Sequence, residues 1–280
     1  MQGLELAELV EYSEARAYAS LIQAAPKPFL ERHGLLAFSV DSAVALVSPP
    51  VTNTLNMNRV IGLGVSEPAT EAIVGKIVQL YGDHGLSFAV EVGPFARPKE
   101  IAGWLRARRI RRAVATAMHY RVANPVEAGT GPLSAERAPH SARQIVADIC
   151  CQVFRMPPTV HTLIAGTADI PGWRHWIAYA GDRPVAAALS YVSDGVAWFG
   201  WDATLPEFRG RGAQSSLIVQ RLNDAARAGC RYVTTETAMN TKANTDPSYV
   251  NYERLGFSLA YERATYVALR GAGKSGAEAR

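Results

Sequence analysis

The chain has 280 residues, of which 48% are hydrophobic and 19% charged, and a formal net charge of +4 at pH 7. This composition is typical of a folded globular protein and excludes intrinsic disorder and a fibrous architecture. At about 150 residues per domain, the length predicts two domains. No apolar run approaches the roughly 18 residues of a membrane span, and the N-terminus is acidic, so we expect a cytoplasmic protein with no membrane partner.

The sequence offers no pattern for a metal or for nucleic acid. Three cysteines cannot form a disulfide framework or a four-ligand zinc site, and the six histidines lack metal-ligand spacing, so we expect reduced thiols and no metal. The arginines between residues 106 and 112 are not interleaved with aromatic residues, as a single-strand platform requires. We interpret them as a solvated helix end and expect no nucleic-acid partner.

The first half of the chain alternates strand and helix patterns. Apolar periodicity predicts strands over residues 59–64, 87–92 and 114–122, and helices over 68–81 and 98–106. Residues 124–140 are rich in Pro and Gly, with little apolar periodicity, which predicts a linker. The first domain therefore spans residues 1–123.

The second half has a clearer pattern. Ser141 is a candidate N-cap for a helix over residues 141–154. Turn dipeptides separate three runs over 173–180, 184–192 and 196–204, which predicts three antiparallel strands. A helix over 213–228, closed by Gly229, a strand over 232–237, a helix over 248–255 and one or two strands over 257–269 follow. We expect a second mixed α/β domain over 141–270 and a disordered tail over 271–280.

The segment from Pro206 to Gln214 carries the chemistry. Gly210 and Gly212 let the main chain curl with several N–H groups pointing inward, and the following helix adds unpaired N–H donors and the positive end of its dipole. Two arginines, Arg209 and Arg211, raise the local potential. This combination predicts a diphosphate-binding turn.

Dinucleotides and coenzyme A both fit a strand, a glycine loop and a helix. A Rossmann unit requires parallel strands joined by helical crossovers, whereas the strands before this loop are joined by two-residue turns and must be antiparallel. Only 44 residues (280 − 236) follow Glu236, too few for the second half of a doubly wound sheet. The sequence therefore favours coenzyme A.

Two motifs resemble the GNAT superfamily of acyl-CoA-dependent N-acyltransferases. Arg209, Gly212 and Gln214 occupy the positions of its pyrophosphate motif Arg/Gln-x-x-Gly-x-Gly/Ala, with Gln214 in place of the usual small residue. Tyr252 precedes Gly256-Phe257 by four residues, as in the family's second signature. The resemblance covers residues 141–269; in the first half it is architectural only.

The resemblance implies an α/β fold of two GNAT-like domains, each a mostly antiparallel mixed sheet flanked by helices. It implies a cytoplasmic N-acetyltransferase, with acetyl-CoA as co-substrate, that acetylates a primary amine by direct attack and needs no metal. A main-chain N–H at the strand end, Ala203 to Leu205, would face the thioester. The expected cofactor-binding residues are Ala203, Thr204, Leu205, Arg209, Gly210, Arg211, Gly212, Ala213, Gln214, Ser215 and Asn251.

Two side chains are candidates for proton transfer. Tyr252 would act as general acid for the departing thiolate, with Tyr249 on the same helical face as a substitute. Glu236, near the end of a strand, would act as general base for the amine, and Asp202 is the second candidate. An alternative function is a non-catalytic acyl-CoA-binding module or sensor, and the protein is expected to be a monomer or a homodimer.

Overall fold

The computed structural model describes residues 3–127, 133–241 and 244–270. Within them, an 11-stranded sheet has the order β1-β2-β3-β4-β11-β5-β10-β9-β8-β7-β6. Its strands are β1 (Leu36–Val40), β2 (Ala43–Val47), β3 (Arg59–Ile61), β4 (Phe88–Val92), β5 (Arg111–Val122), β6 (Ser134–Arg137), β7 (Trp173–Ala180), β8 (Arg183–Ser193), β9 (Val196–Thr204), β10 (Tyr232–Ala238) and β11 (Ser258–Ala268). The α-helices are α1 (Leu4–Gln23), α2 (Lys27–His33), α3 (Glu71–Asp83), α4 (Ile101–Ala107), α5 (Arg143–Phe154), α6 (Pro158–Gly166), α7 (Ala213–Arg227) and α8 (Pro247–Arg254).

The sheet interleaves the two halves of the chain. The last strand of the second half, β11, pairs antiparallel with both β4 and β5 of the first half. In turn β5 pairs antiparallel with β10 of the second half. The mixed α/β class is confirmed, but the sheets expected in separate domains are joined into one. The joining leaves no open strand edge between the halves, which removes unpaired N–H and C=O groups.

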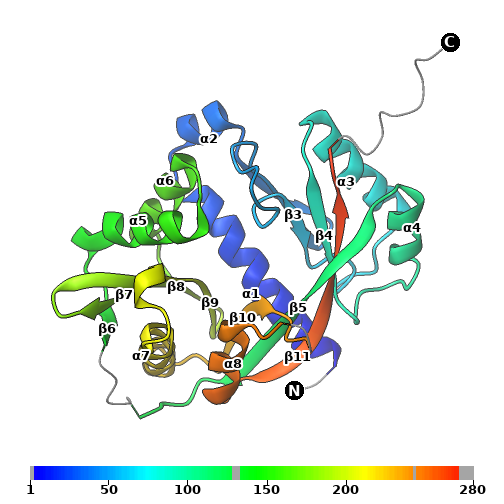
Figure 1. Cartoon of the computed structure of the whole chain (residues 1–280). Helices are drawn as coiled ribbons and strands as arrows, with labels where there is room; N and C mark the ends of the chain where they lie inside the picture. Colours follow the sequence, from blue (N-terminus) through cyan, green and yellow to red (C-terminus); the bar gives the residue numbers. More distant parts are fainter. Residues whose placement is uncertain (1–2, 128–132, 242–243, 271–280) are drawn as a thin grey trace.

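Helix α1 lies between the two halves (Figure 1), and the sequence analysis missed it. Leu21 and Ile22 on its buried face belong to one apolar cluster with Leu46 of β2 and with Ile164 and Trp198 of the second half. The two halves therefore share a hydrophobic core. The domain boundaries at residues 123 and 141 stay a prediction.

Helices cover both faces of the second-half sheet. Along β8, Ala187 and Leu189 pack in the cluster that contains α5, whereas Ala186 and Ala188 pack in the cluster that contains Leu217 of α7. Successive strand residues point to opposite faces, so this alternation places α5 and α7 on opposite sides of the sheet. Helices α5 and α7 therefore contribute to the walls of the site described below from opposite faces of the sheet.

Most of the predicted elements are confirmed, with shifts of a few residues at their ends. Strands β7, β8 and β9 match the three predicted antiparallel strands. Helix α7 ends before Gly229, whose φ of +73° is the left-handed conformation expected just beyond a helix end. Helix α8 likewise stops before Gly256, and residues 257–269 supply one strand, β11.

Two expectations are wrong. Ser134–Arg137, inside the predicted linker, form strand β6, because the edge of β7 offers them a pairing partner. Ser141 does not cap the next helix: it lies in a 3₁₀ turn, and α5 begins after Ala142 without a side-chain cap.

The predicted disordered tail, residues 271–280, lies outside the described residues. In the described parts of the chain, no helix combines the length and apolarity that crossing a membrane requires.

We predict that Leu21→Ala destabilises the whole protein by about 2 to 5 kcal/mol, because a fully buried leucine in a tightly packed core leaves a cavity. Chemical denaturation followed by circular dichroism and tryptophan fluorescence measures this, and the shared core predicts one cooperative transition in both signals. Gln23→Ala, at an exposed position of the same helix, is the control and should change stability by less than about 0.5 kcal/mol. Two separated transitions would contradict a shared core.

Candidate active site

Strands β9 and β10 diverge in the middle of the sheet. They pair in parallel only from Val196–Tyr232 to Phe199–Thr235, and each strand continues beyond that point without the other. At the last pair, the Thr235 hydroxyl donates a hydrogen bond of 3.0 Å to the Phe199 carbonyl. A wedge-shaped opening follows beyond this pair.

An irregularity in β9 turns the strand away. Ala187 pairs with Ala203 but Leu189 pairs with Gly200, so Trp201 and Asp202 share a single partner position, a β-bulge. Trp201 adopts the left-handed conformation with φ +59°. A bulge bends its strand and re-aims the neighbouring side chains. The divergence of β9 from β10 thus begins at the bulge.

Gly200 is required at the start of the bulge. A Cβ atom on this residue would lie 2.1 Å from the ring of Trp198. The absence of a side chain lets the indole of Trp198 pack against Gly200 of its own strand. This brings Trp198 to the wall of the opening.

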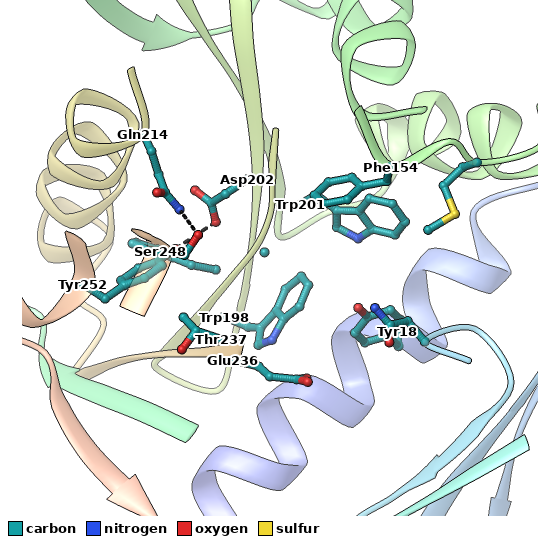
Figure 2. A pocket seen from close by; sticks show the side chains of 14 residues that line it. Tyr18, Phe154, Trp198, Trp201, Asp202, Gln214, Glu236, Thr237, Ser248 and Tyr252 are labelled. Carbon is teal, nitrogen blue, oxygen red and sulfur yellow. Dashed lines mark hydrogen bonds between the residues drawn. The ribbon is translucent and has the colours of Figure 1, made fainter. Parts of the chain in front are cut away.

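A pocket of about 210 Å³ occupies the opening between the diverging strands (Figure 2). Its walls come from β9, β10, α7, α8 and the end of α5, together with Tyr18 of α1 and Asn56 from the first half of the chain. The described residues that line it are Tyr18, Asn56, Phe154, Met156, Trp198, Phe199, Gly200, Trp201, Asp202, Gln214, Glu236, Thr237, Ser248 and Tyr252.

A larger groove of about 1260 Å³ runs between the end of β9, the N-terminus of α7 and the helix α8. Pocket and groove have four lining residues in common, Phe154, Asp202, Gln214 and Ser248. The two cavities therefore meet at these side chains. A ligand in the groove and a second ligand in the pocket can come into contact there.

The glycine loop forms an open cradle at one wall of the groove. Gly210 and Gly212 have φ of +73° and +83°, and a Cβ on either would meet no atom within 4 Å. The backbone N–H groups of residues 210–215 find no acceptor among the described residues, since the first helical bond of α7 comes from Ser216. Free N–H groups at the positive end of a 15-residue helix favour an anion, so the loop fits the diphosphate of coenzyme A.

Eight of the eleven predicted cofactor-binding residues line the groove: Thr204, Arg209, Gly210, Gly212, Ala213, Gln214, Ser215 and Asn251. Ala203, Leu205 and Arg211 are not among the lining residues. Ala203 is buried, and the Leu205 N–H already donates to the Val185 carbonyl at 3.0 Å, so it is not free for a thioester. The Arg211 guanidinium lies over the Phe208 ring, 5.2 Å from its centre.

Gln214, the departure from the family motif, connects the two helices that flank the groove. Its amide nitrogen donates to the Ser248 hydroxyl at 3.0 Å, and its amide oxygen accepts from the Asn251 side chain at 2.8 Å. One N–H donor of the Asn251 side-chain amide is therefore already used in the hydrogen bond to Gln214. Ser248 was not predicted, and its position on α8 follows from the N-cap Asp246, whose carboxylate accepts from the Tyr249 N–H.

Tyr252 lies buried in the pocket wall. Its hydroxyl donates to Asp202 at 2.8 Å and accepts a 3.3 Å hydrogen bond from Arg221, which is itself ion-paired with Asp202. Burial raises the pKa of the Tyr252 phenol above its ordinary value, and the Asp202 charge raises it further while Arg221 opposes the shift. The phenol is therefore protonated at neutral pH.

The two alternatives to the leading catalytic residues are placed differently. Asp202 lines both cavities, but its carboxylate is held by Arg221 and Tyr252. Tyr249 packs edge-on against the buried His119 with ring centres 4.8 Å apart, and it lines neither cavity. The sequence did not predict Arg221 as a site residue, because a buried arginine on an apolar helix face leaves no recognisable sequence pattern.

Glu236 lies at the wedge between β9 and β10 with one side in the pocket. One carboxylate oxygen accepts hydrogen bonds from Arg59 at 3.1 Å and from Arg263 at 2.9 Å. Burial is the largest cause that raises the pKa of Glu236, to about 8, and the neighbouring Glu14 raises it while the two arginines lower it. The side chain keeps 20% of its surface exposed, so it can reach a ligand.

Glu236 belongs to a buried ion cluster that joins the two halves. In it the guanidinium groups of two arginines face four carboxylates from α1, β4 and β10. The members are Arg59, Arg263, Glu11, Glu14, Glu91 and Glu236. Two cations facing four carboxylates favour retention of a proton within the cluster. The described residues contain no group of three His, Cys, Asp or Glu side chains suited to a metal ion.

Comparison with known proteins agrees with the fold. Residues 153–235 match the family described as an acetyltransferase (GNAT) domain. A GCN5-related N-acetyltransferase from Kribbella flavida is similar in structure, with a TM-score of 0.61, 15% identity and coverage of 90% of this chain and 94% of that one. One from Sphaerobacter thermophilus has a TM-score of 0.58, 15% identity and coverage of 81% and 80%.

A tandem GNAT protein from the clavulanic acid biosynthesis pathway is also similar, with a TM-score of 0.55, 19% identity and coverage of 76% of this chain and 75% of that one. No curated protein sequence matches the chain. The predicted resemblance to the GNAT superfamily is confirmed: residues 153–235 match a GNAT acetyltransferase domain, and the chain shares its fold with GCN5-related N-acetyltransferases and with a tandem GNAT protein. This domain and fold support acyl transfer in general.

We predict that Gly212→Ala weakens coenzyme A binding by about tenfold or more, because a methyl group enters the open cradle and strains a left-handed residue. Isothermal titration calorimetry measures the affinity. Gly229→Ala is the matched control: it lies at the other end of α7, has φ +73° and open space, and carries the same strain away from the groove. Equal losses in both variants would assign the effect to strain and contradict the cradle.

Proposed function

We propose that the protein is an acetyl-CoA-dependent N-acetyltransferase that acetylates a primary amine by direct attack. The observation that carries this proposal is the meeting of the two cavities. The groove with the anion cradle and the pocket with Glu236 share Asp202, Gln214 and Ser248 at their junction. A thioester reaching the junction from the groove would meet an amine held in the pocket.

The groove would hold the coenzyme by its charge. The N–H groups of residues 210–215 would bind the diphosphate, and the exposed Arg209 and Arg254 side chains would contribute positive potential along the groove. No metal is needed for this binding. Acetyl-CoA enters as co-substrate and leaves as coenzyme A.

Glu236 would prepare the amine. An ammonium group is not nucleophilic, so one proton must leave it before attack. A carboxylate with a pKa near 8 is a stronger base than an ordinary glutamate, and the part of Glu236 exposed in the pocket would take this proton directly or through one water. The amine nitrogen then forms a bond to the acetyl carbon.

Collapse of the tetrahedral intermediate breaks the carbon–sulfur bond and releases a thiolate. The nitrogen loses its excess proton in the same step, and this proton would pass through water to restore the Tyr252 phenol after Tyr252 has protonated the sulfur. Tyr252 would donate its phenolic proton toward that sulfur, because its hydroxyl lies at the pocket wall and is protonated at neutral pH. The hydroxyl must first turn away from Asp202, and Arg221 remains beside Asp202 to balance its charge. The product amide and coenzyme A then leave by the pocket and the groove.

The first half of the chain would contribute to the site directly. Tyr18 and Asn56 line the pocket, Arg59 donates a hydrogen bond to Glu236, and the charge of Glu14 raises the pKa of Glu236. We further propose that the enzyme is cytoplasmic and acts as a monomer or homodimer with no nucleic-acid or membrane partner. The residue assignments for domains, 1–123 and 141–270, belong to the same proposal.

One observation favours the non-catalytic alternative, an acyl-CoA-binding module. Both proposed proton-transfer groups already have protein partners, Tyr252 with Asp202 and Glu236 with two arginines. An acyl-CoA sensor needs only the groove that binds the coenzyme. A measurement of acetyl transfer therefore distinguishes the enzyme from the sensor.

The test of the proposed function follows thiol release from acetyl-CoA in the presence of a panel of primary amines. We expect amine-dependent release that falls by about 10² to 10⁴ in kcat in Glu236→Gln, because the variant cannot accept the proton. Calorimetry on the same variant should show unchanged coenzyme A affinity. Tight coenzyme binding without thiol release for any amine would favour the sensor.

The pH dependence supplies a second prediction. The kcat of the wild type should rise with pH to a plateau above about 8, since Glu236 must lose its proton to act as base and its pKa is raised to about 8. Glu14→Gln removes a neighbouring negative charge that raises this pKa. The rising limb should therefore move to lower pH by about one unit.

Glu8→Gln on the same helix is the control for this profile. Glu8 has no ion pair among the described residues and should leave the limb in place. The acceptor amine titrates identically in all variants, so a shift confined to Glu14→Gln reports on Glu236. If the rising limb of the kcat–pH profile stays in place in Glu14→Gln, the electrostatic coupling between Glu14 and Glu236 is contradicted.

A further inference from the structure

The pocket and the groove differ in charge. Among the described residues that line the pocket, Asp202 and Glu236 are acidic, and there is no Lys, Arg or His. The groove, in contrast, is lined by Arg209 and Arg254 as well as by the acidic Glu127 and Asp202. The arginines that contact Glu236 belong to the buried cluster behind it and do not line the pocket. An anionic group in the pocket would therefore find no cation to pair with.

Aromatic side chains form the other walls. The rings of Phe154 and Trp201 pack edge to face with centres 5.7 Å apart, and those of Tyr18 and Trp198 do the same at 5.5 Å. Figure 2 shows these four rings around one side of the pocket, with Glu236 below them. Aromatic walls accept a flat or compact apolar body, and the faces of such rings attract an ammonium group.

A carboxylate bound in the pocket would lose its hydration beside Glu236 and gain no countercharge. The indole N–H groups of Trp198 and Trp201 would not compensate for this loss, because both are buried within the walls.

We propose that the acceptor is a small primary amine on a flat or compact apolar body that carries no carboxylate or phosphate group. This inference rests on the proposed function and names its substrate class. The amine lies toward Glu236, and the apolar body lies among Tyr18, Phe154, Trp198 and Trp201. Free amino acids are then poor acceptors even where their side chains fit.

Matched pairs of acceptors test the proposal with the full-length protein. Phenethylamine and tryptamine differ from phenylalanine and tryptophan by the α-carboxylate alone. We expect kcat/KM for each amine to exceed that for its amino acid by about a hundredfold, because the carboxylate has no countercharge in the pocket. Equal or better rates with the amino acids would overturn the proposal.

A charge introduced at the pocket rim tests the physical cause. Asn56 is exposed and lines the pocket, so Asn56→Arg adds a cation there without disturbing the core. The preference for phenethylamine over phenylalanine should shrink by about tenfold or more. Thr52→Arg is the matched control, since Thr52 is exposed on the same loop and does not line the pocket. An unchanged preference in Asn56→Arg would contradict the charge argument.

Binding measured by tryptophan fluorescence separates this proposal from the proposed function. Trp198 and Trp201 lie in the pocket walls, so phenethylamine should change their emission at lower concentration than phenylalanine, with or without coenzyme A. If phenethylamine binds selectively but no thiol is released, the proposed function fails and the ligand class stands. If amino acids are acetylated efficiently, the function stands and the ligand class fails. If neither compound alters the emission, the ligand class fails.

Discussion

The separation of β9 from β10 is the constraint on which the site depends. Parallel pairing ends at Phe199 and Thr235, and the bulge at Trp201 and Asp202 turns β9 away. Backbone groups freed from the ladder need other partners, and a ligand entering the wedge can supply them. Glu236 stands on one side of the wedge and the junction of the two cavities on the other. One break in the sheet thus places the coenzyme groove beside the acceptor pocket.

The wedge is held open by groups from both halves of the chain. Arg59 of β3 and Arg263 of β11 fix Glu236 from behind, and Glu14 of α1 adjusts its pKa. Burying such a cluster carries a desolvation cost, which the mutual ion pairs and hydrogen bonds must offset. The interleaved strands keep these residues at fixed distances. The first half of the chain therefore acts as a structural part of the site as well as its cover.

The sequence predicted the parts of the fold that depend on local signals. Turn dipeptides fixed the three strands before the loop, and glycines at positive φ marked the glycine loop and the ends of α7 and α8. Interleaving of β5 and β11 depends on pairing between residues more than a hundred positions apart, which no local pattern records. Strand β6 was missed for the same reason, because only the edge of β7 makes it extended.

The sequence predicted the glycine loop of the candidate site but not the buried networks around its catalytic candidates. The cradle at Gly210 and Gly212 was evident because glycine leaves a clear trace in sequence, whereas the network of Tyr252, Asp202 and Arg221 arises from three separate elements. Glu11 and Glu14 were visible only as part of an acidic N-terminus. One signal was overlooked: Gly200, a lone glycine within a strand, is typical of a bulge and marked the wedge.

Hydrogen exchange of the backbone amides, measured by mass spectrometry with and without coenzyme A, tests the central claim most directly. The N–H groups of residues 210–215 have no acceptor in the described part of the chain, so they should exchange rapidly in the free protein and slow markedly when the diphosphate binds them. Peptides over α3 and α4 should not change. Saturating coenzyme A that slows exchange elsewhere and leaves residues 210–215 fast would contradict the account.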